Sequence, residues 1–66
     1  MSMTTLEEGK DLFSTADIAR LTGLSQDYIG DLLQEGIKIR GEKLGRAWIV
    51  RRSEVERFLR EREREQ

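Results

Sequence analysis

Apolar residues recur at spacings of three and four between Thr22 and Gly36, and this spacing predicts a short amphipathic helix. Ser25 stands at the expected N-cap, Leu24 and Ile29 are spaced to pack across that cap, and Gly36 is a C-terminal stop. The apolar face comprises Tyr28, Ile29, Leu32 and Leu33, and the other face Gln26, Asp27, Gly30, Asp31 and Gln34. A short helix with a spare polar face behind a glycine-containing turn is typical of the second helix of a helix-turn-helix.

The preceding segment repeats the same signals. Ser14 stands at an N-cap position, Asp17 closes a capping box, and Phe13 and Ile18 are spaced as a hydrophobic staple. This pattern predicts a first helix over residues 15–22. Gly23 then supplies the conformational freedom that the turn between the two helices requires.

A different periodicity begins at Ile37. Apolar and basic residues alternate over residues 37–40, which predicts a strand. Residues 44–47 fit a two-residue hairpin turn with glycine at its first central position, and Trp48-Ile49-Val50 has the composition of a returning strand. Because a two-stranded hairpin is not stable alone, we expect it to lie on the helices, anchored by Trp48 and Val50.

A third capping pattern precedes the last helix. Ser53 stands at the N-cap and Glu56 at the capping-box position, and Val55, Phe58 and Leu59 form the apolar stripe. The fold class is therefore mainly α, a winged helix-turn-helix with two helices, a short β-hairpin wing and a C-terminal helix. We divide the chain into a flexible N-terminus over 1–10, the winged helix-turn-helix domain over 11–60, and a charged helix end over 61–66.

Charge is distributed unevenly along this plan. The 66 residues carry a net charge of −1, yet residues 38–53 hold six basic residues and one glutamate, whereas residues 1–37 hold two basic and seven acidic residues. A basic segment indicates a polyanionic partner. The alternative is an ordinary solvated strand edge, since edge strands often carry Lys and Arg, but six basic residues exceed what edge protection requires.

Composition narrows the classes of function. The chain has no Cys and no His, so disulfide and thiolate chemistry and the usual neutral-pH base are absent. The serines open apolar-periodic runs and are interpreted as caps rather than nucleophiles. No apolar run approaches a membrane span and no signal-peptide pattern opens the chain. We expect a cytoplasmic protein that is not an enzyme, with no cofactor, no metal and no membrane partner.

Two runs of residues resemble a known family. They are Phe13-Ser14-Thr15-Ala16-Asp17-Ile18-Ala19-Arg20-Leu21-Thr22-Gly23-Leu24-Ser25 and, later, Gly45-Arg46-Ala47-Trp48-Ile49-Val50 followed by Arg52-Ser53-Glu54-Val55-Glu56-Arg57-Phe58-Leu59. Together they resemble the small MerR-like and excisionase-type DNA-binding domains. The resemblance covers roughly residues 12–60. It implies that the second helix enters a DNA major groove and that the wing contacts the backbone or the minor groove.

The resemblance also implies which residues bind DNA. The recognition positions are Ser25, Gln26, Asp27, Tyr28 and Asp31, and the wing positions are Lys43 and Arg46, with Arg51 and Arg52 before the last helix. Lys38 and Arg40 complete the basic segment. Family members usually carry Arg or Lys on the second helix, whereas this helix has none. A carboxylate is repelled by phosphate but accepts a hydrogen bond from cytosine, so Asp27 and Asp31 either read cytosine or mark a helix that stays out of DNA.

Two hypotheses from different classes follow. The first is a sequence-specific double-stranded DNA-binding module, acting as a transcriptional regulator or as an excisionase-like recombination accessory factor. Its few basic contacts predict modest affinity for one copy, hence a homo-oligomer or cooperative assembly on DNA. The alternative is a protein–protein adaptor in which the acidic second helix, residues 26–35, binds a protein partner.

Overall fold

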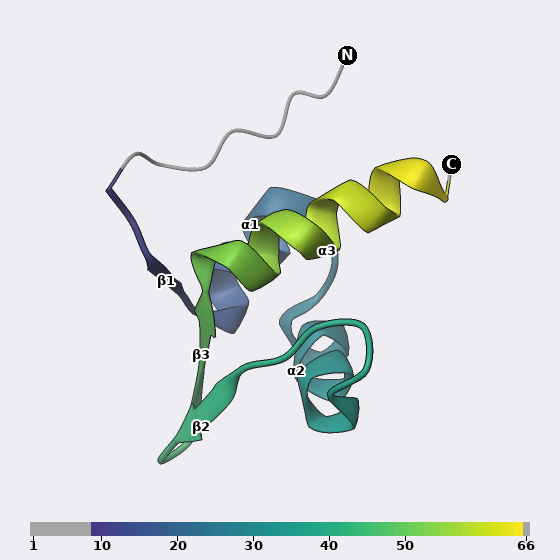
Figure 1. Cartoon of the computed structure of the whole chain (residues 1–66). Coiled ribbons are helices and arrows are strands. Elements are labelled where there is room, and N and C mark those ends of the chain that lie inside the picture. The colour runs from purple at the N-terminus through teal and green to yellow at the C-terminus, as the bar shows by residue number, and fades with distance from the viewer. Residues whose placement is uncertain (1–8, 66) are drawn as a thin grey trace.

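Residues 9–65 are described by the computed structural model, which has three helices and a three-stranded antiparallel sheet (Figure 1). The elements are β1 (Leu12–Phe13), α1 (Thr15–Thr22), α2 (Gln26–Glu35), β2 (Glu42–Leu44), β3 (Ala47–Arg51) and α3 (Arg52–Arg64). This order confirms the predicted winged helix-turn-helix fold. Most of the terminus predicted to be flexible, residues 1–8, lies outside the described residues.

The two helices of the helix-turn-helix begin and end where local sequence predicts. The Ser14 hydroxyl accepts from the backbone N–H of Asp17 at 3.2 Å, and the Asp17 carboxylate accepts from the backbone N–H of Ser14 at 3.0 Å, which completes the capping box of α1. The Ser25 hydroxyl caps α2 by accepting from the backbone N–H of Tyr28 at 3.1 Å. Gly23 and Gly36 close the helices in the left-handed conformation, with φ of 77° and 68°.

The sheet has β3 at its centre. β2 pairs with β3 across the turn at Gly45, whose φ is 63°, and this confirms the predicted two-residue turn. β1 pairs with the other edge of β3, with Phe13 opposite Val50. The sequence pattern did not predict β1, because two residues are too few to show a period. This extra pairing supports a hairpin that would be unstable alone.

The predicted strand over residues 37–40 is wrong. These residues form an irregular connection from α2 to β2, with Ile37 75% exposed and Ile39 fully buried. The backbone groups of the connection bond to α3 instead of to a strand. Glu54 accepts from the backbone N–H of Arg40 at 3.1 Å, and Arg57 donates to the Lys38 carbonyl at 3.2 Å. Satisfying those groups from a helix removes the need for strand pairing there.

The predicted cap at Ser53 is also wrong. β3 passes directly into α3, which begins at Arg52, and Arg51 occupies the N-cap position without a side-chain cap bond. The backbone N–H of Arg52 donates to the Asp11 carbonyl at 2.8 Å. A neighbouring segment of chain thus satisfies one of the free donors at the start of the helix, and no serine is needed for it.

One apolar core joins the three helices to one face of the sheet. The buried residues are Phe13, Ile18, Ile29, Leu32, Leu33, Ile39, Val50, Val55 and Phe58. Val50 is fully buried, and Trp48 packs against the core with partial exposure, so both predicted anchors hold the wing on the helices. α2 contributes Ile29, Leu32 and Leu33 to this core, and its polar residues are exposed on the opposite face.

Candidate nucleic-acid interface

The outer face of α2 is exposed and acidic. Ile29, Leu32 and Leu33 are buried, so the side chains opposite them face solvent. The exposed polar residues are Gln26, Asp27, Asp31, Gln34 and Glu35. Gln34 was not among the predicted contacts, although helical spacing places it beside Asp27 and Asp31. The face offers amides and carboxylates to a partner, and it has no cation.

Positive charge is presented by the wing. Lys43 lies on β2 opposite Trp48, and its amine is 5.3 Å from the centroid of the indole ring. Arg46 is the second residue of the tight turn and is exposed, as Lys43 is. Figure 1 shows the tip of the wing and α2 extending to the same side of α3. One ligand that spans this end of the molecule would contact both.

The other basic residues of the segment do not lie at the tip of the wing. Arg40 lies in the connection, where its Nε donates to the Gly36 carbonyl at 3.3 Å. Arg51 pairs with Leu12 at the far end of β3, about 13 Å along the strand from Ala47 at 3.3 Å per residue. The sequence segment therefore does not form one continuous basic surface.

Arg52 has a structural role. Its guanidinium is partly buried and donates to the Lys10 carbonyl at 2.9 Å and to the Glu56 carboxylate at 3.1 Å. These bonds tie the segment before β1 to the first turns of α3. A role for Arg52 in binding a ligand would compete with these bonds.

An ion-pair network on α3 fixes the connection between α2 and the wing. Arg57 contacts Glu54 at 2.9 Å and Glu61 at 2.6 Å. The hydrogen bond from Arg57 lowers the pKa of the Glu54 carboxyl, and the bond to Glu54 raises the pKa of the Arg57 guanidinium. Because the same side chains hold Lys38 and Arg40 by their backbones, α3 sets where the wing begins.

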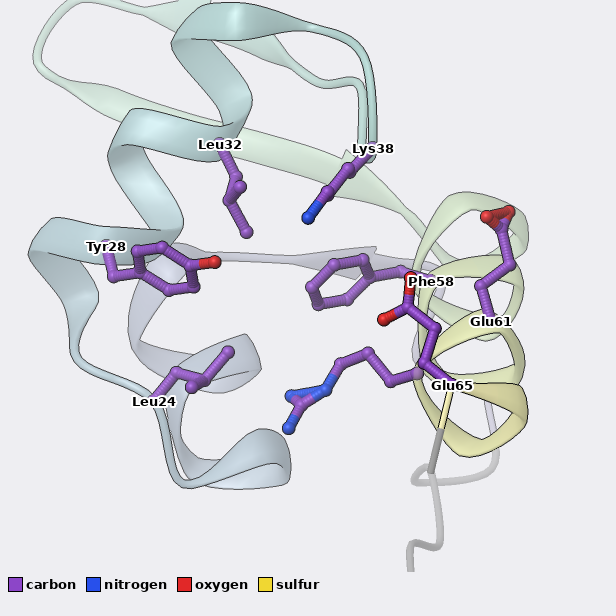
Figure 2. Close-up of a pocket in the computed structure, with 8 residues that line it drawn as sticks. Leu24, Tyr28, Leu32, Lys38, Phe58, Glu61 and Glu65 are labelled. Carbon is purple, nitrogen blue, oxygen red and sulfur yellow. The ribbon is translucent and has the colours of Figure 1, made fainter.

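A hollow of about 330 Å³ lies between α2 and α3 (Figure 2). Its walls are Leu24, Tyr28, Leu32, Lys38, Phe58, Glu61, Arg62 and Glu65. In Figure 2 the hydroxyl of Tyr28 and the amine of Lys38 are directed into the hollow. Tyr28 is 45% exposed, and its ring faces α3 rather than the outer face of α2. The Lys38 side chain likewise lines this hollow and does not lie on the wing.

Two kinds of feature are absent from the described residues. Within residues 9–65, no cluster of three or more Asp and Glu side chains is arranged to hold a metal ion. None of the helices in this range is long and apolar enough to cross a membrane.

Comparison with known protein families supports this fold. The family model described as a helix-turn-helix domain matches residues 12–63, most of the chain and all of the elements above except the last residue of α3. No curated protein and no solved structure matches the chain. The match agrees with the capped pair α1 and α2, the glycine turn between them and the wing that follows. The chain belongs to the helix-turn-helix domain family, whose members are DNA-binding domains.

Proposed function

We propose that this domain binds double-stranded DNA in a sequence-specific manner, with α2 in the major groove and the wing against the backbone or the minor groove. The observation that carries the proposal is the placement of an exposed polar helix and a cationic wing tip on the same side of a helix-turn-helix frame. A protein helix fits the major groove, where base edges present a distinct pattern of donors and acceptors.

The wing and α2 would make different kinds of contact with DNA. Lys43 and Arg46 would supply attraction to phosphates, with Arg40 and Arg51 as weaker, more distant contributors. The amide of Gln26 matches the donor–acceptor pair of adenine, and the carboxylates of Asp27 and Asp31 match the amino group of cytosine. Ser25 lies at the start of α2, where backbone N–H groups favour a phosphate.

The small number of cations on the wing limits the affinity of one copy for DNA. Each phosphate contact contributes about −0.9 to the slope of log K against log salt, so two strong contacts give a shallow slope. One copy would therefore bind modestly, and useful occupancy would come from a homo-oligomer or from adjacent copies on DNA. Such behaviour suits a cytoplasmic transcriptional regulator or an excisionase-like recombination accessory factor.

A selection from a random duplex pool tests the proposal. The purified chain is used to recover bound duplexes, and fluorescence anisotropy then compares an enriched duplex with a scrambled one. The proposal predicts an enriched sequence and preferential binding to it in low salt. A pool without enrichment and equal binding to both duplexes would refute sequence-specific recognition.

A second candidate function is a protein–protein adaptor. The observation that favours it is the outer face of α2, which carries Asp27, Asp31 and Glu35 and no cation. A basic protein surface would complement that face better than a polyphosphate does. An adaptor predicts that neutralising these carboxylates leaves any DNA binding by the wing intact while abolishing binding to the protein partner.

A further inference from the structure

Gly30 is unusual among the glycines of the described residues. Gly9, Gly23, Gly36 and Gly45 have a positive φ, which a side chain rarely tolerates. A Cβ on Gly41 would lie 2.9 Å from the Ile49 carbonyl oxygen, closer than real contacts allow. Each of those five positions has a reason within the fold for lacking a side chain.

Gly30 has no such reason. It lies in the middle of α2 and is not among the residues with a positive φ. A Cβ added there would meet no atom within 4 Å outside its chain neighbours and the backbone of its own helix. Glycine inside a helix destabilises it relative to alanine. The chain therefore has an unfavourable residue at a place where its own packing would accept a larger one, and no contact within the described residues accounts for it.

Helical geometry places Gly30 in a row without charge. Residues four apart lie in one row along a helix, so Gln26, Gly30 and Gln34 form one row, which we name the amide row. Asp27, Asp31 and Glu35 form the adjacent acidic row. Tyr28, two residues before Gly30, lies about 200° away around the helix and faces α3. The amide row is thus the flank of α2 opposite the hollow.

We propose that a phosphodiester strand of DNA runs along the amide row, with Gly30 as the point of closest approach. This inference rests on the proposed DNA binding and specifies how α2 is oriented in the groove. The amide N–H of Gln34, one turn after Gly30, donates to a phosphate oxygen of that strand, while Gln26, one turn before Gly30, keeps its contact with a base. The bare backbone at Gly30 lets the sugar–phosphate chain come nearer than any side chain would permit.

The same orientation accounts for the acidic row. Carboxylates repel phosphates but accept hydrogen bonds from the cytosine amino group at the floor of the major groove. A helix that turns its amide row to one strand turns Asp27 and Asp31 towards the base edges. A helix with no cation can then enter the groove, while Lys43 and Arg46 supply the attraction.

Substitution of Gly30 separates stability from binding. In Gly30→Ala, we expect the melting temperature to rise by roughly 4–8 °C, because alanine favours the helix and meets no neighbour. We expect affinity for a duplex enriched with the wild-type chain to fall roughly tenfold, because the methyl group occupies the place of the DNA strand. Gly30→Leu should bind still more weakly and remain folded. Thermal unfolding by circular dichroism and fluorescence anisotropy with that duplex measure the two effects.

Two neighbouring truncations serve as matched controls. Gln34→Ala removes a donor from the amide row and should weaken binding, whereas Glu35→Ala, in the acidic row, should not. Gly30→Ala that binds the duplex as tightly as wild type, or that melts at a lower temperature, would overturn the inference and leave the proposed function standing. Failure of the wild-type chain to bind any duplex would overturn both.

Discussion

The helix α2 and the wing differ in how they are built and in what they offer a ligand. α2 is capped at both ends, buries three residues in the core and carries no cation. The wing is a three-residue strand, a tight turn and β3, and its exposed part carries Lys43 and Arg46. A DNA-binding helix usually combines shape and positive charge, whereas here the helix has the shape and the wing has the charge.

Because α2 has the shape and the wing has the charge, DNA binding depends on how the two regions are placed relative to each other. The connection between them is held on α3 by Glu54 and Arg57. It passes the core at Gly41, where the backbone lies against Ile49, Val50 and Leu33. A change at this contact would move the charge of the wing relative to α2 without replacing any exposed residue of either region.

Among substitutions outside α2, removing the charge of the wing should have the largest effect on DNA binding. In Lys43→Gln combined with Arg46→Gln, we expect roughly tenfold weaker binding and a salt slope smaller by about 1.8, because two phosphate contacts are lost. Both residues are exposed, and the only contact described for them is that of Lys43 with the Trp48 ring, so the melting temperature should fall by no more than a few degrees. Anisotropy titrations at several salt concentrations measure the slope.

The matched control removes the same charge elsewhere. Arg60→Gln combined with Arg64→Gln neutralises two exposed arginines on α3, outside the wing. That variant should keep most of the affinity. Equal losses in the two double variants would show that net charge, rather than the wing, attracts DNA.

Filling the space at Gly41 should break the placement of the wing. In Gly41→Ala, the new Cβ would lie 2.9 Å from the Ile49 carbonyl oxygen and 3.1 Å from Leu33 Cδ2. Overpacking of this kind costs roughly 1–3 kcal/mol of unfolding free energy. Chemical denaturation measures that loss, and we expect weaker DNA binding with it. Since Gly30→Ala should raise stability, a pair of variants with effects of the same sign would contradict the distinction between the two glycines.

The contrast between the two regions also shows what local sequence predicts. The bounds of α1 and α2 depend on caps, glycines and apolar spacing within a few residues, and these were predicted correctly. The beginning of α3 depends on a bond from Arg52 to Asp11, far away in sequence, so the local serine pattern was misleading. β1 likewise exists through its pairing with β3.

The site was less predictable than the fold for the same reason. Lys38, Arg40, Arg51 and Arg52 are close to the wing residues in sequence, but the turn at Gly36, the length of β3 and the start of α3 send them to different places. Sequence spacing predicted correctly that Asp27 and Asp31 would be exposed. Sequence spacing also placed Tyr28 on the apolar face of α2, in agreement with its direction into the hollow, whereas the resemblance alone placed it among the DNA contacts.

A smaller effect, on the free energy of unfolding alone, is expected at Asp17, which lies in α1 and away from the proposed DNA contacts. The bond from the Ser14 backbone N–H, with Lys10 3.0 Å away, lowers the pKa of Asp17 from 3.8 to about 2. The carboxylate therefore stabilises the fold above its ordinary pKa, and that contribution is lost as the pH falls from about 4 towards 2. Asp17→Ala should cost roughly 1 kcal/mol at neutral pH through loss of the capping box.

Acid titration of unfolding completes this prediction. The difference in unfolding free energy between wild type and Asp17→Ala should shrink as the pH falls through that range. DNA affinity should stay the same under conditions in which both proteins are folded. A difference that is independent of pH would contradict the assignment of the stabilisation to the ionised carboxylate.

Loss of the Tyr28 hydroxyl should have the smallest effect on DNA affinity among the changes to predicted contact residues. Its hydroxyl points into the hollow between α2 and α3 and not along the outer face. Tyr28→Phe should therefore change DNA affinity by less than the roughly 1 kcal/mol of a lost hydrogen bond. Anisotropy with the enriched duplex measures the change. A larger loss would place the hydroxyl on a phosphate and return Tyr28 to the DNA contacts.

The most direct test is a titration of the isotope-labelled chain with an enriched duplex, followed by backbone amide signals in NMR. DNA binding by α2 and the wing together predicts that signals of residues 26–34 and of residues 42–47 shift along the same binding curve. A scrambled duplex should shift the wing signals more weakly. Shifts confined to the wing, with α2 unchanged at saturation, would contradict the placement of α2 in the groove and favour the adaptor.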